Sequence, residues 1–127
     1  MRFLLDTNVV INYLEASLPK ESMLFLNKIL DEKPIISIIT MIETLGYNFK
    51  SIDEQIIMET FINASTILNI SDNIVDKTIT IKKIKKIKIP DAIIAATALH
   101  NDLVLITRNL ADFKNIEELE VTDPYSF

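Results

Sequence analysis

The side chains best placed to do chemistry in this chain are its 18 aspartates and glutamates. The sequence has no cysteine and a single histidine, His100, which excludes thiolate nucleophiles, thiolate zinc sites and clusters of histidine ligands. Gly46 is the only glycine, and a phosphate-binding glycine loop or a nucleophile elbow needs more than one. Such loops and a serine triad are therefore excluded. Any catalysis must depend on aspartate and glutamate, whose oxygens suit hard divalent cations.

One of these carboxylates, Asp6, stands where an apolar segment ends. Residues 2–5 form a short apolar run, which is typical of a buried strand. Asp6, Thr7 and Asn8 are suitable capping residues for a helix that follows directly. The strand would therefore deliver a carboxylate at its carboxyl end, where parallel sheets bind their ligands.

The rest of the chain alternates between strand-like and helix-like segments. Further strands are predicted at residues 35–38, 66–70, 103–107 and 120–122. Helices are predicted at residues 19–30, 53–64, 71–86 and 90–100. Ser71 is the expected N-cap of the third of these, and one more helix begins at Thr40, with Glu43 at capping-box spacing. Apolar strands that alternate with helices specify an α/β fold with a parallel sheet covered on both faces. Thr107, like Asp6, would end a strand of that sheet.

The composition predicts one globular domain with apolar surface to spare. At 127 residues the chain has the usual size of a domain, so we expect one domain over residues 1–127. Hydrophobic residues make up 49% and the mean hydropathy is +0.27, which predicts exposed apolar surface that a second copy or a partner protein would cover. No apolar run approaches the roughly 20 residues of a membrane span. Asp6 and Asn8 interrupt the first apolar run before a signal-peptide core forms, so we expect a cytoplasmic protein.

Four motifs, in this order along the chain, resemble the PIN-domain family and its VapC-like toxin branch. They are LLDTNVVINYL at residues 4–14, MIETLGY at 41–47, IPDAIIAATAL at 89–99 and LITRNLADF at 105–113. The resemblance covers nearly the whole chain, and four motifs in order are far more specific than one. It implies a three-layer PIN-like fold, with a central parallel sheet in the strand order 3-2-1-4-5 flanked by helices.

The resemblance also implies a function and a site. It implies a metal-dependent endoribonuclease that is the toxin of a toxin–antitoxin pair and leaves a 5′-phosphate and a 3′-hydroxyl. The implied metal ligands are Asp6, Glu43, Asp91 and an acid near the last motif. Mg²⁺ or Mn²⁺ is the expected cofactor, because these hard ions bind a few carboxylates, keep several waters and activate one of them for attack on a phosphodiester. The expected partners are an RNA substrate, a cognate antitoxin and a second copy of the chain in a homodimer.

The last motif departs from the commoner family pattern. Many relatives carry aspartate directly after the Thr-Arg pair, where this chain has Asn109. Asp112 is then the natural fourth acid, and either Asp112 or the amide of Asn109 completes the site. Asn8 and Thr107 are expected to orient carboxylates from outside the set of ligands. Arg108 is either a phosphate contact or an ordinary surface arginine.

Each acid also has a purely structural interpretation. Asp6 is a possible helix cap, Asp91 a first-turn acid favoured by the helix dipole, and Asp112 a surface capping residue. Glu43 has the capping-box spacing from Thr40. Its neighbours in the sequence are apolar, however, and an unpaired charge among buried apolar side chains is costly, which favours the ligand role.

Five of the 13 basic residues fall within seven positions, although the net charge of the chain is −5. We call these five the lysine cluster: Lys82, Lys83, Lys85, Lys86 and Lys88. Such a patch could follow RNA phosphates or dock an acidic antitoxin segment. The alternative is a solvated helix face whose isoleucines, Ile81, Ile84 and Ile87, turn inward.

Two other functions remain open at this stage. A haloacid-dehalogenase-like phosphatase also places aspartate at the end of its first strand, but it needs a second aspartate two positions on, where this chain has Asn8. A catalytically inactive PIN-fold module would hold RNA or a protein without cutting. Asn109, in place of the commoner aspartate, keeps this second alternative open.

Overall fold

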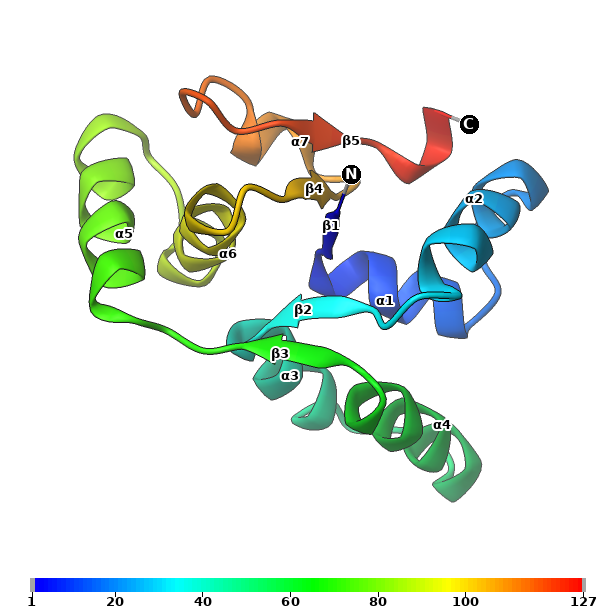
Figure 1. The fold of residues 1–127 in the computed structure, drawn as a ribbon. Helices are drawn as coiled ribbons and strands as arrows, with labels where there is room; N and C mark the ends of the chain where they lie inside the picture. Colours follow the sequence, from blue (N-terminus) through cyan, green and yellow to red (C-terminus); the bar gives the residue numbers. More distant parts are fainter. Residues whose placement is uncertain (1, 127) are drawn as a thin grey trace.

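The computed structural model describes residues 2–126 and shows short parallel strands between layers of helices (Figure 1). The strands are β1 (Phe3–Leu5), β2 (Ile35–Ser37), β3 (Thr66–Leu68), β4 (Val104–Ile106) and β5 (Val121–Thr122). The helices are α1 (Thr7–Leu14), α2 (Lys20–Leu30), α3 (Ile38–Leu45), α4 (Ile52–Asn63), α5 (Asp72–Ile84), α6 (Ile89–His100) and α7 (Leu110–Phe113), and a 3₁₀ turn follows at Pro124–Ser126. The predicted α/β fold is confirmed.

The predicted single sheet in the order 3-2-1-4-5 is not what the structure shows. One parallel sheet has the order β1-β4-β5, and β2 pairs with β3 in a second parallel sheet. β1 and β2 are neighbours in space, but no ladder of backbone hydrogen bonds joins them within residues 2–126. Four of the five strands in the described part of the chain are only three residues long, so each ladder contains few backbone hydrogen bonds.

Side chains on the strands alternate between two cores, as the pleat of a strand requires. Leu4 of β1 and Leu105 of β4 pack in a core formed with α5 and α6. Their neighbours Leu5 and Ile106 pack in a second core, formed with α1, α2 and α4. Figure 1 shows α5 and α6 on one side of β1 and α2 on the other. β1 and β4 pack against both cores, which explains why their sequences are apolar throughout.

Serine side chains start three of the helices. The Ser71 hydroxyl accepts a hydrogen bond from the N–H of Ile74 and caps α5, as predicted. The predicted N-cap at Thr40 is wrong, because Ser37 caps α3 through the N–H groups of Ile39 and Thr40. The helix therefore begins three residues earlier than predicted. Thr40 lies in its first turn with its hydroxyl free of any capping role.

Apolar side chains remain exposed on the outer helices, as the composition predicts. Ile52, Ile56 and Ile57 are exposed on α4, and Val75 and Ile79 are exposed on α5. None of the helices between residues 2 and 126 is both long and apolar enough to cross a bilayer. The exposed side chains therefore mark surface that a partner could cover.

The burial of β4 predicts a large loss of stability on truncation. Leu105 is fully buried, so Leu105→Ala leaves a cavity and should lower the free energy of unfolding by about 2–5 kcal/mol. Ile56→Ala is the matched control, because Ile56 is 53% exposed, and we expect a change within about 0.5 kcal/mol. Urea denaturation measures both. If both substitutions lowered the free energy of unfolding equally, the assignment of Leu105 to the buried core would be contradicted.

Candidate metal centre

Asp6 lies at the carboxyl end of β1 and is 5% exposed. Its Oδ1 accepts a hydrogen bond from the N–H of Thr7 at 2.9 Å, which caps α1. Its Oδ2 accepts a hydrogen bond from the Thr107 hydroxyl at 2.7 Å, across from the end of β4. Asp6 is thus a helix cap and a strand-end acid at the same time. Thr107 orients it, and β1 and β4 are adjacent parallel strands whose carboxyl ends meet at one edge.

Asp91 lies in the first turn of α6, where Pro90 helps to start the helix. Burial raises the pKa of the Asp91 carboxyl, and the negative charges of Asp6, Asp112 and Glu43 raise it further, while Lys88 lowers it. The pKa of Asp6 is also raised, chiefly by burial, with an added contribution from the charge of Glu43 and opposing contributions from its hydrogen bonds. The four predicted acids therefore share one electrostatic neighbourhood. They come from four separate segments of the chain.

Glu43 projects from α3 toward the end of β1. Its Oε1 accepts a hydrogen bond from the Thr7 hydroxyl at 2.7 Å. The predicted cost of placing Glu43 among its apolar neighbours does not apply, because Ile42 is 58% exposed and Leu45 is 43% exposed. The helical turn directs these two side chains outward, and Glu43 is itself exposed. The position of Glu43 beside Thr7, rather than any cost of burial, is what favours a functional role.

The two candidates for the fourth position are hydrogen-bonded to each other. The side-chain amide of Asn109 donates to Oδ2 of Asp112 at 2.6 Å. The backbone N–H of Asn109 donates to the Thr107 hydroxyl oxygen at 3.0 Å. Sequence reasoning treated Asn109 and Asp112 as alternatives. In the structure they form a pair, in which Asn109 links the exposed Asp112 carboxylate on α7 to Thr107, the residue that follows β4.

The donor chemistry fits a divalent cation, although the ligands are not fully assembled. Within residues 2–126, no three acidic or histidine side chains converge closely enough to form a ready-made metal site. Negative charges of the neighbouring acids contribute to the raised pKa values of Asp6 and Asp91, and a hard cation with oxygen ligands would remove that repulsion. The side chains would close around such an ion from the positions described above.

The other predicted polar residues have individual roles. Asn8 is exposed on α1, and no hydrogen bond of its side chain is found in the described part of the chain, so its orienting role stays a prediction. The guanidinium of Arg108 lies 3.5 Å from the centroid of the Tyr125 ring, a cation–π contact that holds Arg108 beside Thr107. The predicted phosphate contact of Arg108 stays a prediction.

The lysine cluster lies at the end of α5 and in the turn that leads to α6. Ile81 and Ile87 are buried, but Ile84 is 67% exposed, so only part of the predicted inward-facing set faces inward. The Lys82 ammonium donates to the Ile87 carbonyl oxygen at 2.5 Å and closes the turn. Exposed Lys83, Lys86 and Lys88 and half-buried Lys85 remain on the surface, on the segment that runs into Asp91. The cluster is thus close in sequence to one of the acids.

Thr7 and Thr40 are polar contacts of the site that sequence reasoning missed. Thr7 was taken only as a capping residue and Thr40 only as an N-cap. The Thr7 hydroxyl lies 3.0 Å from the Thr40 hydroxyl and 2.7 Å from Glu43 Oε1. The available signal was a threonine directly after Asp6 and another one turn before Glu43. The contact itself joins residues 33 positions apart, and no local pattern reveals it.

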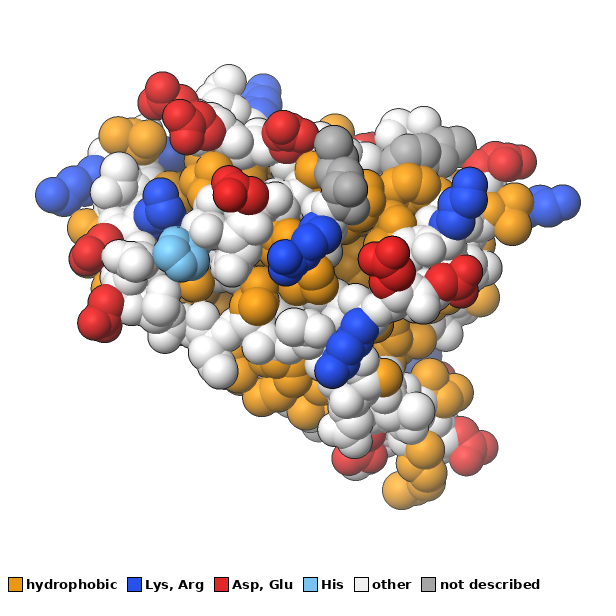
Figure 2. Space-filling view, viewed as in Figure 1, with side chains coloured by type: hydrophobic (Ala, Val, Ile, Leu, Met, Phe, Trp, Pro, Cys, Tyr) orange, Lys and Arg blue, Asp and Glu red, His pale blue; other side chains and the backbone are white. Residues whose placement is uncertain are grey.

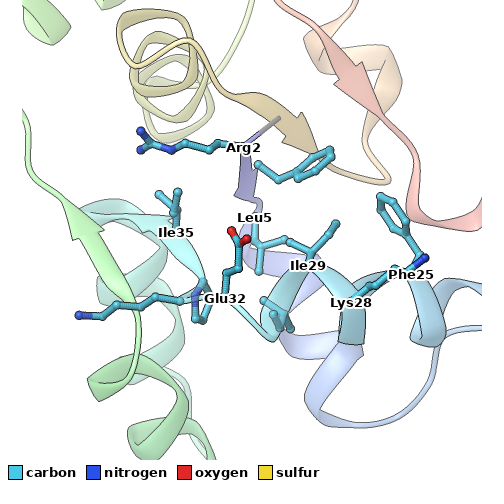
Figure 3. Close-up of a pocket in the computed structure, with 11 residues that line it drawn as sticks. Arg2, Leu5, Phe25, Lys28, Ile29, Glu32 and Ile35 are labelled. Atoms are coloured by element: carbon cyan, nitrogen blue, oxygen red, sulfur yellow. The ribbon is translucent and has the colours of Figure 1, made fainter.

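A separate pocket lies at the other end of the strands. On the face shown in Figure 2, hydrophobic side chains form a hollow near the middle of the molecule. The pocket has a volume of about 300 Å³. Figure 3 shows that Arg2 and Ile35, at the amino ends of β1 and β2, lie opposite Phe25 and Lys28 of α2. None of the four acids lines it. It is therefore distinct from the carboxyl edge of the sheet.

Parallel strands between helices, with acids gathered at the carboxyl edge, are the architecture of a PIN domain. The chain belongs to the PIN-domain family, whose sequence pattern it matches over residues 3–119. The predicted resemblance to VapC-like PIN toxins is confirmed by similarity to solved structures. A toxin–antitoxin complex from Klebsiella pneumoniae contains a chain 33% identical to this one, covering 98% of this chain and 99% of that chain with a TM-score of 0.74.

Two further structures have similar chains. DNA-bound VapBC from Salmonella typhimurium contains a chain with 25% identity and a TM-score of 0.81, covering 98% of both chains. VapBC-1 from nontypeable Haemophilus influenzae contains a chain with 26% identity and a TM-score of 0.78, also covering 98% of both. No curated protein sequence matches this chain significantly.

The raised carboxyl pKa values predict how stability depends on pH when no metal is bound. The folded-state pKa values of Asp6 and Asp91 lie above their usual value. At pH values between the usual pKa and the raised pKa, the folded protein therefore holds more protons than the unfolded chain. The free energy of unfolding should therefore fall as pH rises from about 4 through the raised values. Asp6→Asn removes the buried charge, so in EDTA its Tm should exceed that of the unmodified protein at neutral pH.

The Tm difference should shrink as pH falls toward about 4, because the raised pKa of Asp6 makes its carboxyl take up a proton as pH falls. Thermal melts followed by circular dichroism from pH 4 to 8 measure it. Glu59→Gln, which changes an exposed glutamate on α4, is the control and should not reproduce the pattern. An Asp6→Asn protein that is less stable than the unmodified one at every pH would contradict the prediction.

Proposed function

We propose that this chain, as a single PIN domain over residues 1–127, is a metal-dependent endoribonuclease. The observation that carries the proposal is the electrostatic coupling of Asp91 to Asp6, Glu43 and Asp112, acids from four segments that share one edge of the fold. PIN domains of VapC toxins are nucleases in general and generally use divalent metals, and this chain is similar to them. Within this general nuclease activity, we propose that the substrate of this chain is RNA.

Asp6, Glu43, Asp91 and Asp112 are the proposed ligands of one or two Mg²⁺ or Mn²⁺ ions. Their carboxylates are acceptor-only groups and suit a hard cation. When bound, the cation would supply Lewis-acid activation of water and neutralise charge on the phosphodiester. Thr107 holds Asp6 through its 2.7 Å hydrogen bond.

Asn109 completes the site by orientation rather than by charge in this proposal. Its amide is already used as a donor to Asp112, which leaves Asp112 with its other carboxylate oxygen for the ion. An asparagine that presents N–H to a carboxylate directs that carboxylate without adding a fourth negative charge beside Asp6. The substitution at position 109 is thus compatible with an active site.

Removal of the buried acid should abolish cleavage. We expect Asp6→Asn to reduce RNA cleavage by at least about 100-fold, because it deletes a charged ligand of the ion. The assay follows cleavage of structured RNA in Mg²⁺ or Mn²⁺, with EDTA expected to stop the unmodified protein. Glu59→Gln serves as the control and should cut normally. Full activity of Asp6→Asn, or full activity in EDTA, defeats the nuclease assignment.

The lysine cluster is the proposed track for RNA phosphates. Lys83 and Lys86 are exposed, whereas Lys82 closes the α5–α6 turn and is left intact in the test. Arg108, held over Tyr125, would add a further phosphate contact beside Thr107.

We expect the double substitution Lys83→Ala and Lys86→Ala to weaken RNA binding and to reduce the slope of log affinity against log salt by about 1 to 2. Binding is measured from 50 to 300 mM salt in EDTA, so that cleavage does not interfere. Lys20→Ala, an exposed lysine at the start of α2, is the control. An unchanged salt slope in the double variant would contradict the RNA-binding role and would support the alternative that the lysine cluster is a solvated helix face.

The proposed biological role is that of a cytoplasmic toxin neutralised by an antitoxin protein. The support is the similarity to chains solved in a toxin–antitoxin complex and in VapBC assemblies. Exposed apolar side chains on α4 and α5 give both an antitoxin and a second copy in a homodimer surface to bury.

Expression in a bacterial host tests the toxin role. We expect expression of this chain alone to arrest growth, Asp6→Asn to be harmless, and co-expression with the product of the neighbouring gene to restore growth. Growth curves and viable counts give the readout. Normal growth with active, soluble protein present would contradict the toxin role while leaving the nuclease assignment standing.

A catalytically inactive PIN-fold module is the second candidate, favoured by Asn109 and by the absence of a fully assembled group of ligands among residues 2–126. RNA or protein binding that persists in Mg²⁺ without any cleavage would support it. A haloacid-dehalogenase-like phosphatase is not supported, because Asn8 occupies the position of its second aspartate.

A further inference from the structure

Thr7 contacts two of the acids with two different groups. Its backbone N–H donates to Asp6 Oδ1 at 2.9 Å, and its hydroxyl donates to Glu43 Oε1 at 2.7 Å. Asp6 follows β1, whereas Glu43 lies on α3, which follows β2. One residue at the start of α1 therefore links carboxylates on segments that no backbone ladder joins.

The directions of the hydroxyl hydrogen bonds follow from counting protons. A threonine hydroxyl has one proton, and an ionised carboxylate only accepts. The Thr7 proton is used on Glu43, so the 3.0 Å contact between the Thr7 and Thr40 hydroxyls requires Thr40 to donate. The result is a directed chain, from Thr40 through Thr7 to Glu43. Each bond in such a chain polarises and strengthens the next.

Thr40 differs in this respect from other helical threonines of the protein. Five of them donate their hydroxyl to the carbonyl oxygen four residues earlier: Thr44, Thr60, Thr78, Thr80 and Thr97. Thr40 lies in the first turn of α3, where the residue four positions earlier belongs to β2. Its fully buried hydroxyl is therefore directed out of its own helix and toward Thr7.

We propose that Thr40 and Thr7 are positioning residues that hold Glu43 in place for the metal centre. The inference rests on the metal-dependent function proposed above. Glu43 is exposed and has a flexible side chain, so without a partner it would sample many rotamers. The Thr7 hydroxyl fixes its carboxylate on the Asp6 side. The Thr107 hydroxyl does the same for Asp6, while accepting from the N–H of Asn109.

The first test removes the Thr7 hydroxyl alone. Thr7→Val keeps the shape of the side chain and the N–H that donates to Asp6, and Thr7→Ser keeps the hydroxyl. We expect Thr7→Val to weaken Mn²⁺ binding by about 10- to 100-fold, as loss of a partner behind a ligand does, and Thr7→Ser to restore most of the affinity. Calorimetric titration with Mn²⁺ measures this. Unchanged Mn²⁺ affinity in Thr7→Val, or equal losses in both variants, would overturn the proposal.

The second test asks whether Thr40 acts through Thr7. Thr40→Val should weaken Mn²⁺ binding less than Thr7→Val, because Thr7 can still donate to Glu43. If the hydroxyls form one chain, the double variant should bind no more weakly than Thr7→Val alone. Additive losses would show that Thr40 acts independently and would overturn the directed chain. Thr40→Ser, which keeps the hydroxyl in a buried position, controls for loss of packing.

A third measurement separates the failure of this inference from the failure of the metal centre. Carbon-13 relaxation of the Glu43 side chain is compared between the unmodified protein and Thr7→Val in EDTA. We expect Glu43 to be ordered in the former and mobile in the latter. If the unmodified protein binds no Mn²⁺, the metal centre is wrong, and the relaxation result alone decides whether Thr7 positions Glu43. Equal order in both proteins would overturn the positioning role.

Discussion

Repulsion between like charges at the carboxyl edge of the sheet is the constraint around which the site is organised. Neutral donors form hydrogen bonds with two of these acids. Asp6 accepts hydrogen bonds from the Thr107 hydroxyl and the Thr7 N–H, and Asp112 accepts one from the Asn109 amide. Neutral donors orient a carboxylate and leave its charge in place. Ionised carboxylates gathered at this edge would therefore favour a cation and disfavour an unaccompanied phosphate.

The scaffold makes this arrangement possible through its layered packing. Leu4 and Leu5 anchor β1 in opposite cores, so the strand cannot rotate and Asp6 leaves it in one direction. On one side, α6 packs with fully buried alanines, among them Ala95 and Ala98. Small side chains let a helix approach the sheet closely, which brings the first turn of α6 and Asp91 toward the edge. Stability and charge placement are thus properties of the same strands and helices.

Much of the fold was predictable from the sequence, because it depends on local patterns. Apolar strands, the Ser71 cap and the strand-end position of Asp6 follow from residue types within a few positions of each other. The start of α3 was misplaced because Ser37 and Thr40 are both good caps, and only tertiary packing selects between them. The contacts of Glu43 were unpredictable, since its partner Thr7 is 36 positions away. The grouping of the acids came from family resemblance and not from any spacing rule.

The division of the strands into two sheets has a mechanical consequence. Asp6 and Thr107 belong to the unit built on β1, β4 and β5, whereas Glu43 is carried by α3 beside β2 and β3. Side-chain packing joins these units at the β1–β2 boundary, together with the hydrogen-bond contacts of Thr7 with Thr40 and Glu43. A slight shift along that boundary would move Glu43 relative to Asp6 while leaving the bond between Asp6 and Thr107 intact. A cation held by both Asp6 and Glu43, as proposed above, would therefore join the two units directly.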